Sequence, residues 1–437
     1  MRRTSLVLLT LTAFLVNARA EQPTKDPRRC SRSFSPTENV PERRPMHRNR
    51  QLCMCVVLLL ALVCTARAGE RTLERSTPRG QTKLTADDWP KLLRQAQNGN
   101  HKAQTRVAIE FSKGEIIKQD FAQAMKWFSE AAKQTDPIAE YNLGVMYYSG
   151  RGVERNPAAA AQWFEKAASR GMPEAEFDSA CLYETGVGVQ QNLGRAFHLY
   201  REAAKSGYAP AQNNLGLMYD SGAGVAHNPA AAIEWFMKSA AQGYAKGQFN
   251  VAAMYSNGSG VARDYAKAAQ WLALAAKQGH TKAQTALGDL YLGGWGVPQD
   301  NHAAANWYQQ AAEGGDMAAQ TKLGILYLNG RGVARDDFAA VQWLSKAAEQ
   351  GHHEAHAKLA RLYETGRGVS RDLNRAYFWR LLSLDGASST QRDELRELAR
   401  FLSSDDIVDA ERQASEWRSL HPAIRPAEPE LFPVLKP

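Results

Sequence analysis

Residues 139–171 read AEYNLGVMYYSGRGVERNPAAAAQWFEKAASRG, and this pattern returns every 36 positions along the chain. Tryptophan marks the repeat on one ladder and tyrosine on a second, while glycine closes successive units on a third. Three ladders in one phase indicate a repeat architecture, since self-similarity at a fixed period is its sequence signature. The tryptophans of the first ladder are Trp127, Trp163, Trp235, Trp271, Trp307, Trp343 and Trp379, with Leu199 at the one rung that lacks tryptophan.

Each unit predicts two helices. In the quoted copy, Ala139, Leu143 and Tyr147 recur every fourth residue and therefore share one face of a first helix. Gly150 ends that helix, because glycine readily adopts the left-handed backbone of a helix C-terminus. A second helix begins in every unit at an Asp or Asn, whose side chain can accept hydrogen bonds from the free N–H groups of the first turn. These capping residues are Asp120, Asn156, Asn192, Asn228, Asp264, Asp300, Asp336 and Asp372.

A single pair of short helices cannot bury its apolar stripe, whereas stacked pairs share a continuous core. The sequence therefore predicts an all-α fold, a right-handed α/α superhelical solenoid of about eight helix–turn–helix repeats of 36 residues. Gly144 returns inside the first helix as Gly216, Gly288 and Gly324, which predicts close approach of a neighbouring backbone.

The pattern A-x-x-x-L-G-x-x-Y-x-x-G-x-G-V-x-x-D/N-x-x-x-A-x-x-W-x-x-x-A-A-x-x-G resembles the Sel-one-like repeat, a relative of the tetratricopeptide repeat. A second clear copy is AQTALGDLYLGGWGVPQDNHAAANWYQQAAEGG at 283–315, and the resemblance covers roughly 100–387. Two copies depart from it. The first has Ile116 and Ile117 at the glycine-valine turn, and the third has Ser179 and Ala180 in place of Leu-Gly.

The net charge of +9 comes almost entirely from the N-terminal region. Residues 1–68 hold twelve of the 54 Lys and Arg residues but only four of the 45 Asp and Glu residues, which leaves 42 basic and 41 acidic residues in the remainder. A basic footprint for nucleic acid is therefore absent from the array. Four of the five cysteines also lie in 1–68, so no disulfide can form within the array, and Cys181 is expected to be a small buried apolar residue.

Residues 1–68 are predicted to be a leader with two tandem signal-peptide-like segments, 1–20 and 46–68. Each has a basic start, an apolar run too short for a membrane span, and a small-residue cleavage pattern. Our hypothesis is that Met46 is the true start and that cleavage follows Ala68, giving a periplasmic or secreted product without a transmembrane span.

The remaining boundaries follow from the repeat phase. We expect a flexible linker over 69–84, an N-terminal capping helix over 85–101, the array over 102–387, a C-terminal helical cap over 388–420 and a proline-rich disordered tail over 421–437. The caps are expected because the terminal units of a solenoid need a polar outer face.

A search for catalytic and metal-binding motifs favours neither kind of site. No S-x-x-K or G-x-S-x-G sequence occurs, which argues against a β-lactamase-like envelope enzyme. The cluster His352-His353-Glu354-Ala355-His356 does not match H-E-x-x-H, and its first two histidines fall in the turn between units. We therefore interpret it as a solvated turn and expect no cofactor, no metal and no catalytic activity.

The expected function is non-catalytic binding of a protein or peptide partner of the cell envelope in the concave groove. The resemblance to tetratricopeptide pairs implies that first helices line this groove, and its middle would be rich in aromatic and amide side chains, which suit an extended peptide. Packing between units is the alternative role for these residues, and a peptidoglycan- or glycan-binding module is the alternative function. The candidate residues are Tyr141, Asn142, Tyr148, Phe177, Asp178, Asn213, Asn214, Asp220, Phe249, Asn250, Asp289, Lys358 and Arg361.

Overall fold

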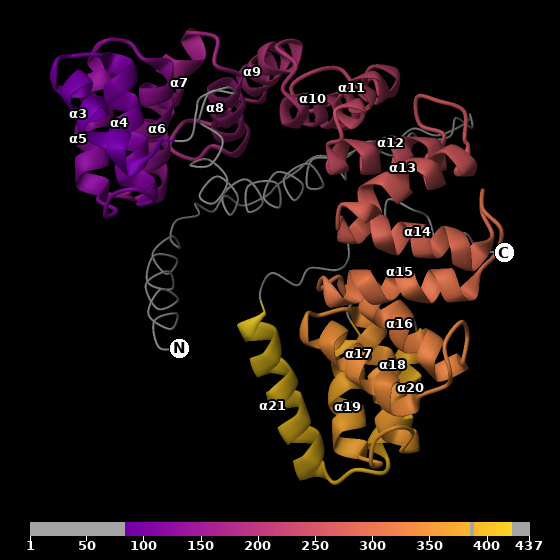
Figure 1. Ribbon diagram of the computed structural model, residues 1–437. Coiled ribbons are helices and arrows are strands. Elements are labelled where there is room, and N and C mark those ends of the chain that lie inside the picture. The colour runs from indigo at the N-terminus through magenta and orange to yellow at the C-terminus, as the bar shows by residue number, and fades with distance from the viewer. Residues whose placement is uncertain (1–83, 385–388, 422–437) are drawn as a thin grey trace, which may run out of the picture. The chain divides into compact units, whose positions relative to one another are not determined.

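A computed structural model describes residues 84–384 and 389–421, which form 19 α-helices and no strand (Figure 1). The predicted all-α array of helix pairs is confirmed, because each helix from α3 to α19 packs against the helix that follows it. The predicted leader and nearly all of the predicted linker and proline-rich tail lie outside the described residues. Among the residues that are described, no helix combines the length and the apolar character needed to span a membrane.

Eight helix pairs, here called units 1 to 8, make up the array. The first helices are α4 (His101–Lys113), α6 (Pro137–Ser149), α8 (Pro173–Thr185), α10 (Ala209–Ser221), α12 (Ala245–Asn257), α14 (Thr281–Gly293), α16 (Met317–Asn329) and α18 (His353–Thr365). The second helices are α5 (Phe121–Lys133), α7 (Pro157–Ser169), α9 (Leu193–Lys205), α11 (Pro229–Ala241), α13 (Tyr265–Lys277), α15 (Asn301–Glu313), α17 (Asp337–Glu349) and α19 (Leu373–Leu382).

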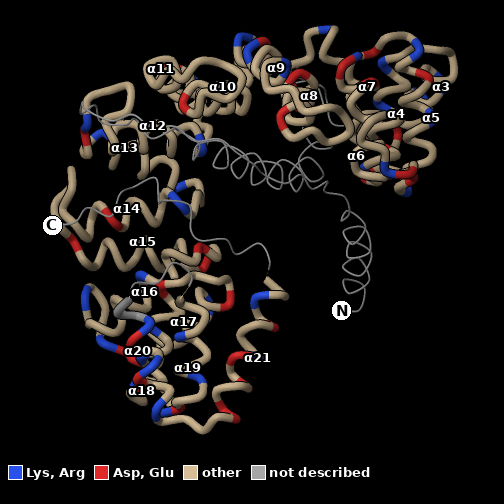
Figure 2. The backbone as a smooth tube through the Cα atoms, turned by 180° about the vertical axis from the view of Figure 1, so that it is seen from behind, with Lys and Arg blue, Asp and Glu red and all other residues tan. Residues whose placement is uncertain are grey.

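Short helices flank the array at both ends. A 3-10 turn (Ala86–Asp88) and α3 (Trp89–Gln97) precede unit 1, and α3 packs on α4. After unit 8 come α20 (Ser389–Ala399) and α21 (Ser404–Leu420), of which both contact α19. Charges of both signs are interspersed along the helices (Figure 2), and the composition of this region is nearly neutral.

The predicted caps of the second helices are confirmed in all eight units. Each Asp or Asn side chain accepts a hydrogen bond from the backbone N–H three residues later, at 2.9 to 3.1 Å. The first helices end where glycine was expected to end them. Gly150, for example, adopts a left-handed conformation with φ of 72° and donates its N–H to the Met146 carbonyl.

The glycines inside the first helices face side chains of the second helix, which corrects our expectation of a neighbouring backbone. A Cβ atom on Gly144 would lie 2.6 Å from the ring of Phe164, and one on Gly216 would lie 2.6 Å from the ring of Phe236. At these positions and at Gly288 an aromatic ring takes the space that a side chain on the first helix would fill, so packing requires the glycine. At Gly324 the expected backbone is close, since a Cβ there would lie 3.2 Å from the Ala340 carbonyl oxygen as well as 2.8 Å from Leu344.

The centre of the core is the position that follows the tryptophan ladder in each unit. Phe128, Tyr200, Phe236 and Tyr308 are among the largest side chains with less than 2% exposure, whereas the tryptophans themselves are half-buried and pack between units. We call these equivalent positions the core rung. Its members from unit 1 to unit 8 are Phe128, Phe164, Tyr200, Phe236, Leu272, Tyr308, Leu344 and Arg380.

A ladder of glutamines joins three consecutive helices. Gln212 on α10 donates through Nε2 to the Ala204 carbonyl of α9, and its Oε1 accepts from Nε2 of Gln242, which follows α11, at 2.8 Å. The glutamine pair recurs with the same spacing of 30 residues as Gln104–Gln134, Gln248–Gln278 and Gln320–Gln350. In unit 2 a charged pair replaces it, since Arg170 donates to Glu140 at 2.8 Å.

Candidate partner-binding site

The structure divides the predicted groove residues by exposure. Five are buried between neighbouring helices and offer little surface to a partner, namely Tyr141, Asn142, Tyr148, Asn213 and Phe249. Seven are half-buried, namely Phe177, Asp178, Asn214, Asp220, Asn250, Asp289 and Lys358, while Arg361 is exposed. The partly exposed residues therefore form the surface that the first helices can present.

The buried members contribute mainly to packing. Asn142 donates through Nδ2 to the Ile138 carbonyl one turn earlier, and its Oδ1 is buried without a hydrogen bond. The ring of Phe249 stacks on His280 of the next unit with centroids 4.9 Å apart. These contacts fix how one first helix sits against the next.

Polar contacts link first helices of successive units at one recurring spacing. The Tyr141 hydroxyl donates to Asp178 Oδ2 at 2.8 Å, and the Asn250 Nδ2 donates to Asn213 Oδ1 at 2.8 Å, both across 37 residues. Burial raises the pKa of Asp178 to about 7, although the hydrogen bond from Tyr141 acts in the opposite direction. The candidate face thus contains a carboxyl group that titrates near neutral pH.

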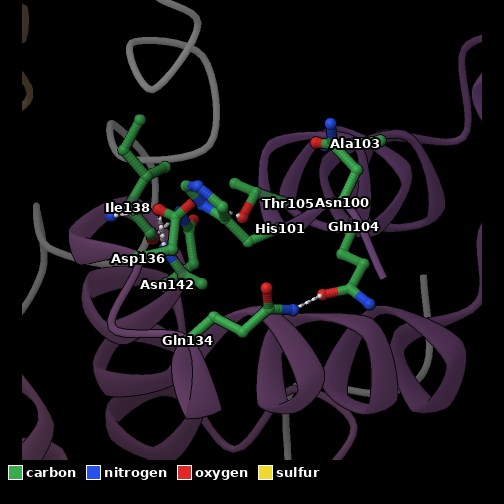
Figure 3. A network of polar contacts seen from close by, with 10 residues as sticks. Asn100, His101, Ala103, Gln104, Thr105, Gln134, Asp136, Ile138 and Asn142 are labelled. Atoms are coloured by element: carbon green, nitrogen blue, oxygen red, sulfur yellow. Dashed lines mark hydrogen bonds and ion pairs between the residues drawn. The ribbon is translucent and has the colours of Figure 1, made fainter. Parts of the chain in front are cut away.

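A second contact joins several of the first helices to the residue that precedes the next first helix. Figure 3 shows it between units 1 and 2, where Asp136 accepts from the Thr105 hydroxyl at 3.1 Å and lies 2.9 Å from His101 Nδ1. Thr285 and Thr321 make the equivalent contacts with Asp316 and His352 near the C-terminal end. In units 3 and 4 the contact is aromatic, since Phe177 packs against Tyr208 with ring centroids 5.5 Å apart.

Unit 3 holds a polar cluster around the hydroxyl of Tyr200. This hydroxyl donates to Glu184 Oε2 at 2.7 Å, accepts from Asn214 Nδ2 at 3.1 Å and lies 3.1 Å from Cys181 Sγ. Burial raises the pKa of the Glu184 carboxyl above its ordinary value. Cys181 is buried, as we predicted, but it contacts a polar hydroxyl rather than a purely apolar core.

Unit 6 holds a related cluster around Tyr308. Its hydroxyl donates to Asp289 Oδ1 at 2.5 Å, and the ammonium of Lys322 lies 2.8 and 2.7 Å from the two oxygens of the same carboxylate. Sequence reasoning selected Asp289 and Asn214 but missed Glu184, Tyr200, Tyr308 and Lys322. The sequence did contain a signal for these clusters. Most units have phenylalanine or leucine at the core rung, and a tyrosine at the same position brings a hydroxyl that needs a hydrogen-bond partner when it is buried.

Lys358 and Arg361 form the basic end of the candidate face. They lie three residues apart on α18 and therefore project from the same side of that helix. Within the described residues neither side chain has an ion pair.

The histidine cluster is not a solvated turn, which corrects our interpretation. His352 and His353 are half-buried, and the Thr321 hydroxyl contacts the ring of His352 at 2.8 Å. His356 is 1% exposed, donates through Nε2 to the Ala348 carbonyl and takes the place of glutamine in the ladder. Burial lowers its pKa to about 4. No group of three or more His, Cys, Asp or Glu side chains suited to a metal ion occurs in 84–384 or 389–421.

A surface pocket lies between α3, the end of α4 and the turn where unit 1 departs from the repeat pattern. It has a volume of about 390 Å³ and is lined by Trp89, Leu93, Phe111, Ile117, Lys118, Gln119 and Asp120. The isoleucine that replaces the valine of the usual turn is part of its wall.

The family model described as Sel1 repeat matches the chain eight times, over 101–136, 137–172, 173–208, 209–244, 245–280, 281–316, 318–352 and 353–379. These matches coincide with units 1 to 8 and cover more than half of the sequence. No curated protein matches the chain significantly.

Solved structures of repeat proteins resemble the chain as well. A Sel1 repeat protein from Oxalobacter formigenes is 31% identical, with 75% of this chain and 97% of that chain covered and a TM-score of 0.55. The protective antigen c5321 of uropathogenic Escherichia coli, which displays an SLR fold, is 27% identical, with 88% and 96% covered and a TM-score of 0.43. The predicted resemblance is thereby confirmed, and the chain belongs to the Sel1 repeat family.

Proposed function

We propose that the chain is a non-catalytic scaffold that binds a segment of a partner protein along the first helices of units 3 to 6. The scaffold fold itself is that of the Sel1 repeat family, which commonly mediates protein–protein interaction. The observation that carries the proposal is the row of half-buried polar side chains on α8, α10, α12 and α14.

The chemistry of this row suits a peptide. Asn214 and Asn250 stand at the same rung of adjacent units, and amide groups can donate to and accept from the backbone of an extended segment. Phe177 and Tyr208 add half-buried aromatic surface beside them, and aromatic side chains commonly anchor protein interfaces. The mixed charges of the array favour neither nucleic acid nor any other strongly charged polymer.

Site-specific photocrosslinking in the native host tests the proposal. A benzophenone amino acid at Asn250 should crosslink one discrete partner protein, because this rung faces the proposed ligand. The same group at Glu234, which is exposed on the second helix α11, serves as the matched control. Equal products from both positions, or none from either, would contradict binding along the first helices.

We further propose that the partner belongs to the cell envelope and that the chain is exported to it. The support is the pair of signal-like segments before residue 69, each with its own basic, apolar and small-residue parts. N-terminal sequencing of the exported product should give Gly69 as the first residue. A mature end near Glu21 would instead show that the first segment is the functional signal.

A further inference from the structure

The clusters around Tyr200 and Tyr308 are two versions of one arrangement. The two tyrosines occupy the core rung of units 3 and 6, and each passes its hydroxyl between two first helices toward a carboxylate. Asn214 and Lys322 occupy one rung as well, immediately before the core leucines Leu215 and Leu323 of the following units. The two carboxylates, in contrast, lie one helical turn apart on the first helix, since Cys181 holds the position of Asp289 in unit 3 and Leu292 holds that of Glu184 in unit 6.

In the unit 6 version the carboxylate is paired with an ammonium group. Lys322 reaches Asp289 at 2.7 Å, and its Nζ lies 6.0 Å from the centroid of the Tyr308 ring. The Tyr308 hydroxyl and ring and the Asp289 carboxylate thus surround one primary ammonium group, and the chain's own Lys322 supplies that group. Both side chains of the ion pair are about one quarter exposed, so the site opens onto the surface.

In the unit 3 version the cation is missing. Glu184 is 6% exposed, and its side chain accepts one hydrogen bond, from Tyr200. The residue at the lysine rung is Asn214, which brings an amide in place of an ammonium. A buried carboxylate that has neither a cation nor a full set of donors is costly, because desolvation penalises its charge.

In unit 8 the residue equivalent to Glu184 is paired with a cation. That residue is Glu364, and the guanidinium of Arg380, which holds the core rung there, lies 3.2 Å from Glu364 Oε2. The positional equivalent of Glu184 and the carboxylate one turn away in unit 6 are therefore both paired with a cation. The remaining core-rung residues are phenylalanine or leucine and bring no hydroxyl to the first helices.

We propose that the site between α8 and α10, formed by Glu184, Tyr200 and Asn214, binds the ammonium group of a lysine side chain of the partner. This assignment rests on the proposed peptide-binding function and names one residue that the peptide must carry. Lysine is chosen over arginine because unit 6, which keeps the core-rung tyrosine, places a lysine at the position of Asn214, whereas the guanidinium against Glu364 takes the place of that tyrosine. Glu184 receives the ammonium through its second oxygen, and the Tyr200 ring stands beside it as the Tyr308 ring stands beside Lys322.

The raised pKa of Glu184 agrees with this assignment. Burial raises it in the absence of a cation, and an ammonium beside the carboxylate would favour the charged form and lower it again.

Saturation-transfer difference NMR on the full chain tests the site with defined probes. The first probe is the capped pentapeptide acetyl-Ala-Ala-Lys-Ala-Ala-amide, and the references carry norleucine or arginine in place of lysine. Saturation should reach the lysine ε-methylene protons at least about fivefold more strongly than the terminal methyl group of norleucine, since only lysine can form the charge-assisted hydrogen bond.

Two variants and one control locate the effect. Asn214→Lys places an internal ammonium where unit 6 has one, and Glu184→Gln keeps an acceptor for Tyr200 but removes the charge; each should weaken the lysine signal about tenfold. His198→Lys adds the same charge to the exposed surface of α9 and should leave the signal unchanged. Circular dichroism and the melting temperature show that each variant folds, and Asn214→Lys should melt no lower than the wild type.

Equal saturation of the lysine and norleucine probes, or an undiminished lysine signal in both variants, would overturn the assignment. A stronger signal with the arginine probe would also overturn it, because the site would then select guanidinium. These outcomes are independent of the crosslinking result at Asn250. A scaffold that crosslinks its partner but shows no lysine signal keeps the proposed function and loses this site.

Discussion

Gln284 donates to the Ala276 carbonyl like the other glutamines of the ladder, yet its Oε1 is buried without a partner because residue 314, thirty positions later, is glycine. In the four units where the residue thirty positions later is glutamine, its Nε2 donates to Oε1 of the first glutamine at 2.8 to 3.0 Å. An acceptor left without its hydrogen bond in a buried position costs free energy.

Restoring the missing glutamine should stabilise the array. A Cβ on Gly314 would lie 2.5 Å from the Thr281 methyl group, whereas the intact pairs of units 4 and 5 have Ala209 and Ala245 at the threonine rung. We therefore expect Thr281→Ala with Gly314→Gln to raise the free energy of unfolding by about 1 kcal/mol. Urea denaturation of the wild type and the double variant measures this difference in the free energy of unfolding. Gly314→Gln alone is the control and should gain less, and an unstable double variant would contradict the ladder argument.

The carboxyl group of Asp178 should make stability depend on pH. Its folded-state pKa of about 7 lies above the unfolded value, so the folded chain binds the proton more tightly. This contribution is fully present below the unfolded pKa and is lost as the pH rises through 7, at up to about 1.4 kcal/mol per pH unit between the two values. Asp178→Asn keeps an acceptor for Tyr141 and cannot titrate.

Chemical denaturation at pH 5 and pH 8 checks this difference. The wild type should lose more stability across the interval than Asp178→Asn, while other titrating groups cancel between the two chains. Identical losses would mean that Asp178 titrates at its ordinary value in the folded chain.

A larger residue at Gly216, inside α10, should be tolerated only if the facing ring of Phe236 is replaced as well. Gly216→Ala places a methyl group 2.6 Å from the Phe236 ring and should cost about 1 to 3 kcal/mol, as overpacking does. In unit 5 the same two rungs hold Ala252 and Leu272, and both are fully buried. Adding Phe236→Leu to Gly216→Ala should therefore recover part of the loss. Additive losses in thermal denaturation would show that the two positions do not interact.

Deleting one whole unit should leave a shorter folded array. Each helix pair packs chiefly on its neighbours, so removal of 208–243 joins surfaces of the same kind. Removal of 208–225 alone leaves a second helix without its first and should unfold at least the adjoining units. Circular dichroism distinguishes these results, and similar loss of helix in both deletions would contradict the modular packing.

The sequence predicted the helices well because their signals are local. The Asp or Asn caps and the glycines that end the first helices act within a few residues of the chain, so periodicity was enough to place them. The candidate face was harder to predict, since the contacts that bury Tyr141 and Asn213 reach across 37 residues. Their exposure depends on how one unit is rotated against the next, which a single-unit pattern does not contain.

The glutamine ladder and the tyrosine hydroxyls were missed for a related reason. Gln212 resembles a solvent-facing helix residue in the sequence, and only the neighbouring helices show that its amide has partners on both sides. In the sequence, Tyr200 resembles the phenylalanines at the same position of other units. Only the structure shows that its hydroxyl bonds Glu184 and Asn214, which lie on two different helices.

The glutamine ladder also has a mechanical consequence. Each intact rung ties three helices together with directional bonds, so it resists shear between them more than dispersion contacts alone do. The ladder is interrupted at Glu176, whose Oε2 is buried without a partner where Ser206 replaces glutamine, and again at Gln284. Under tension or bending the array should yield at these two joints before the others, and the first of them lies on α8, the helix that also carries Glu184 of the proposed lysine site.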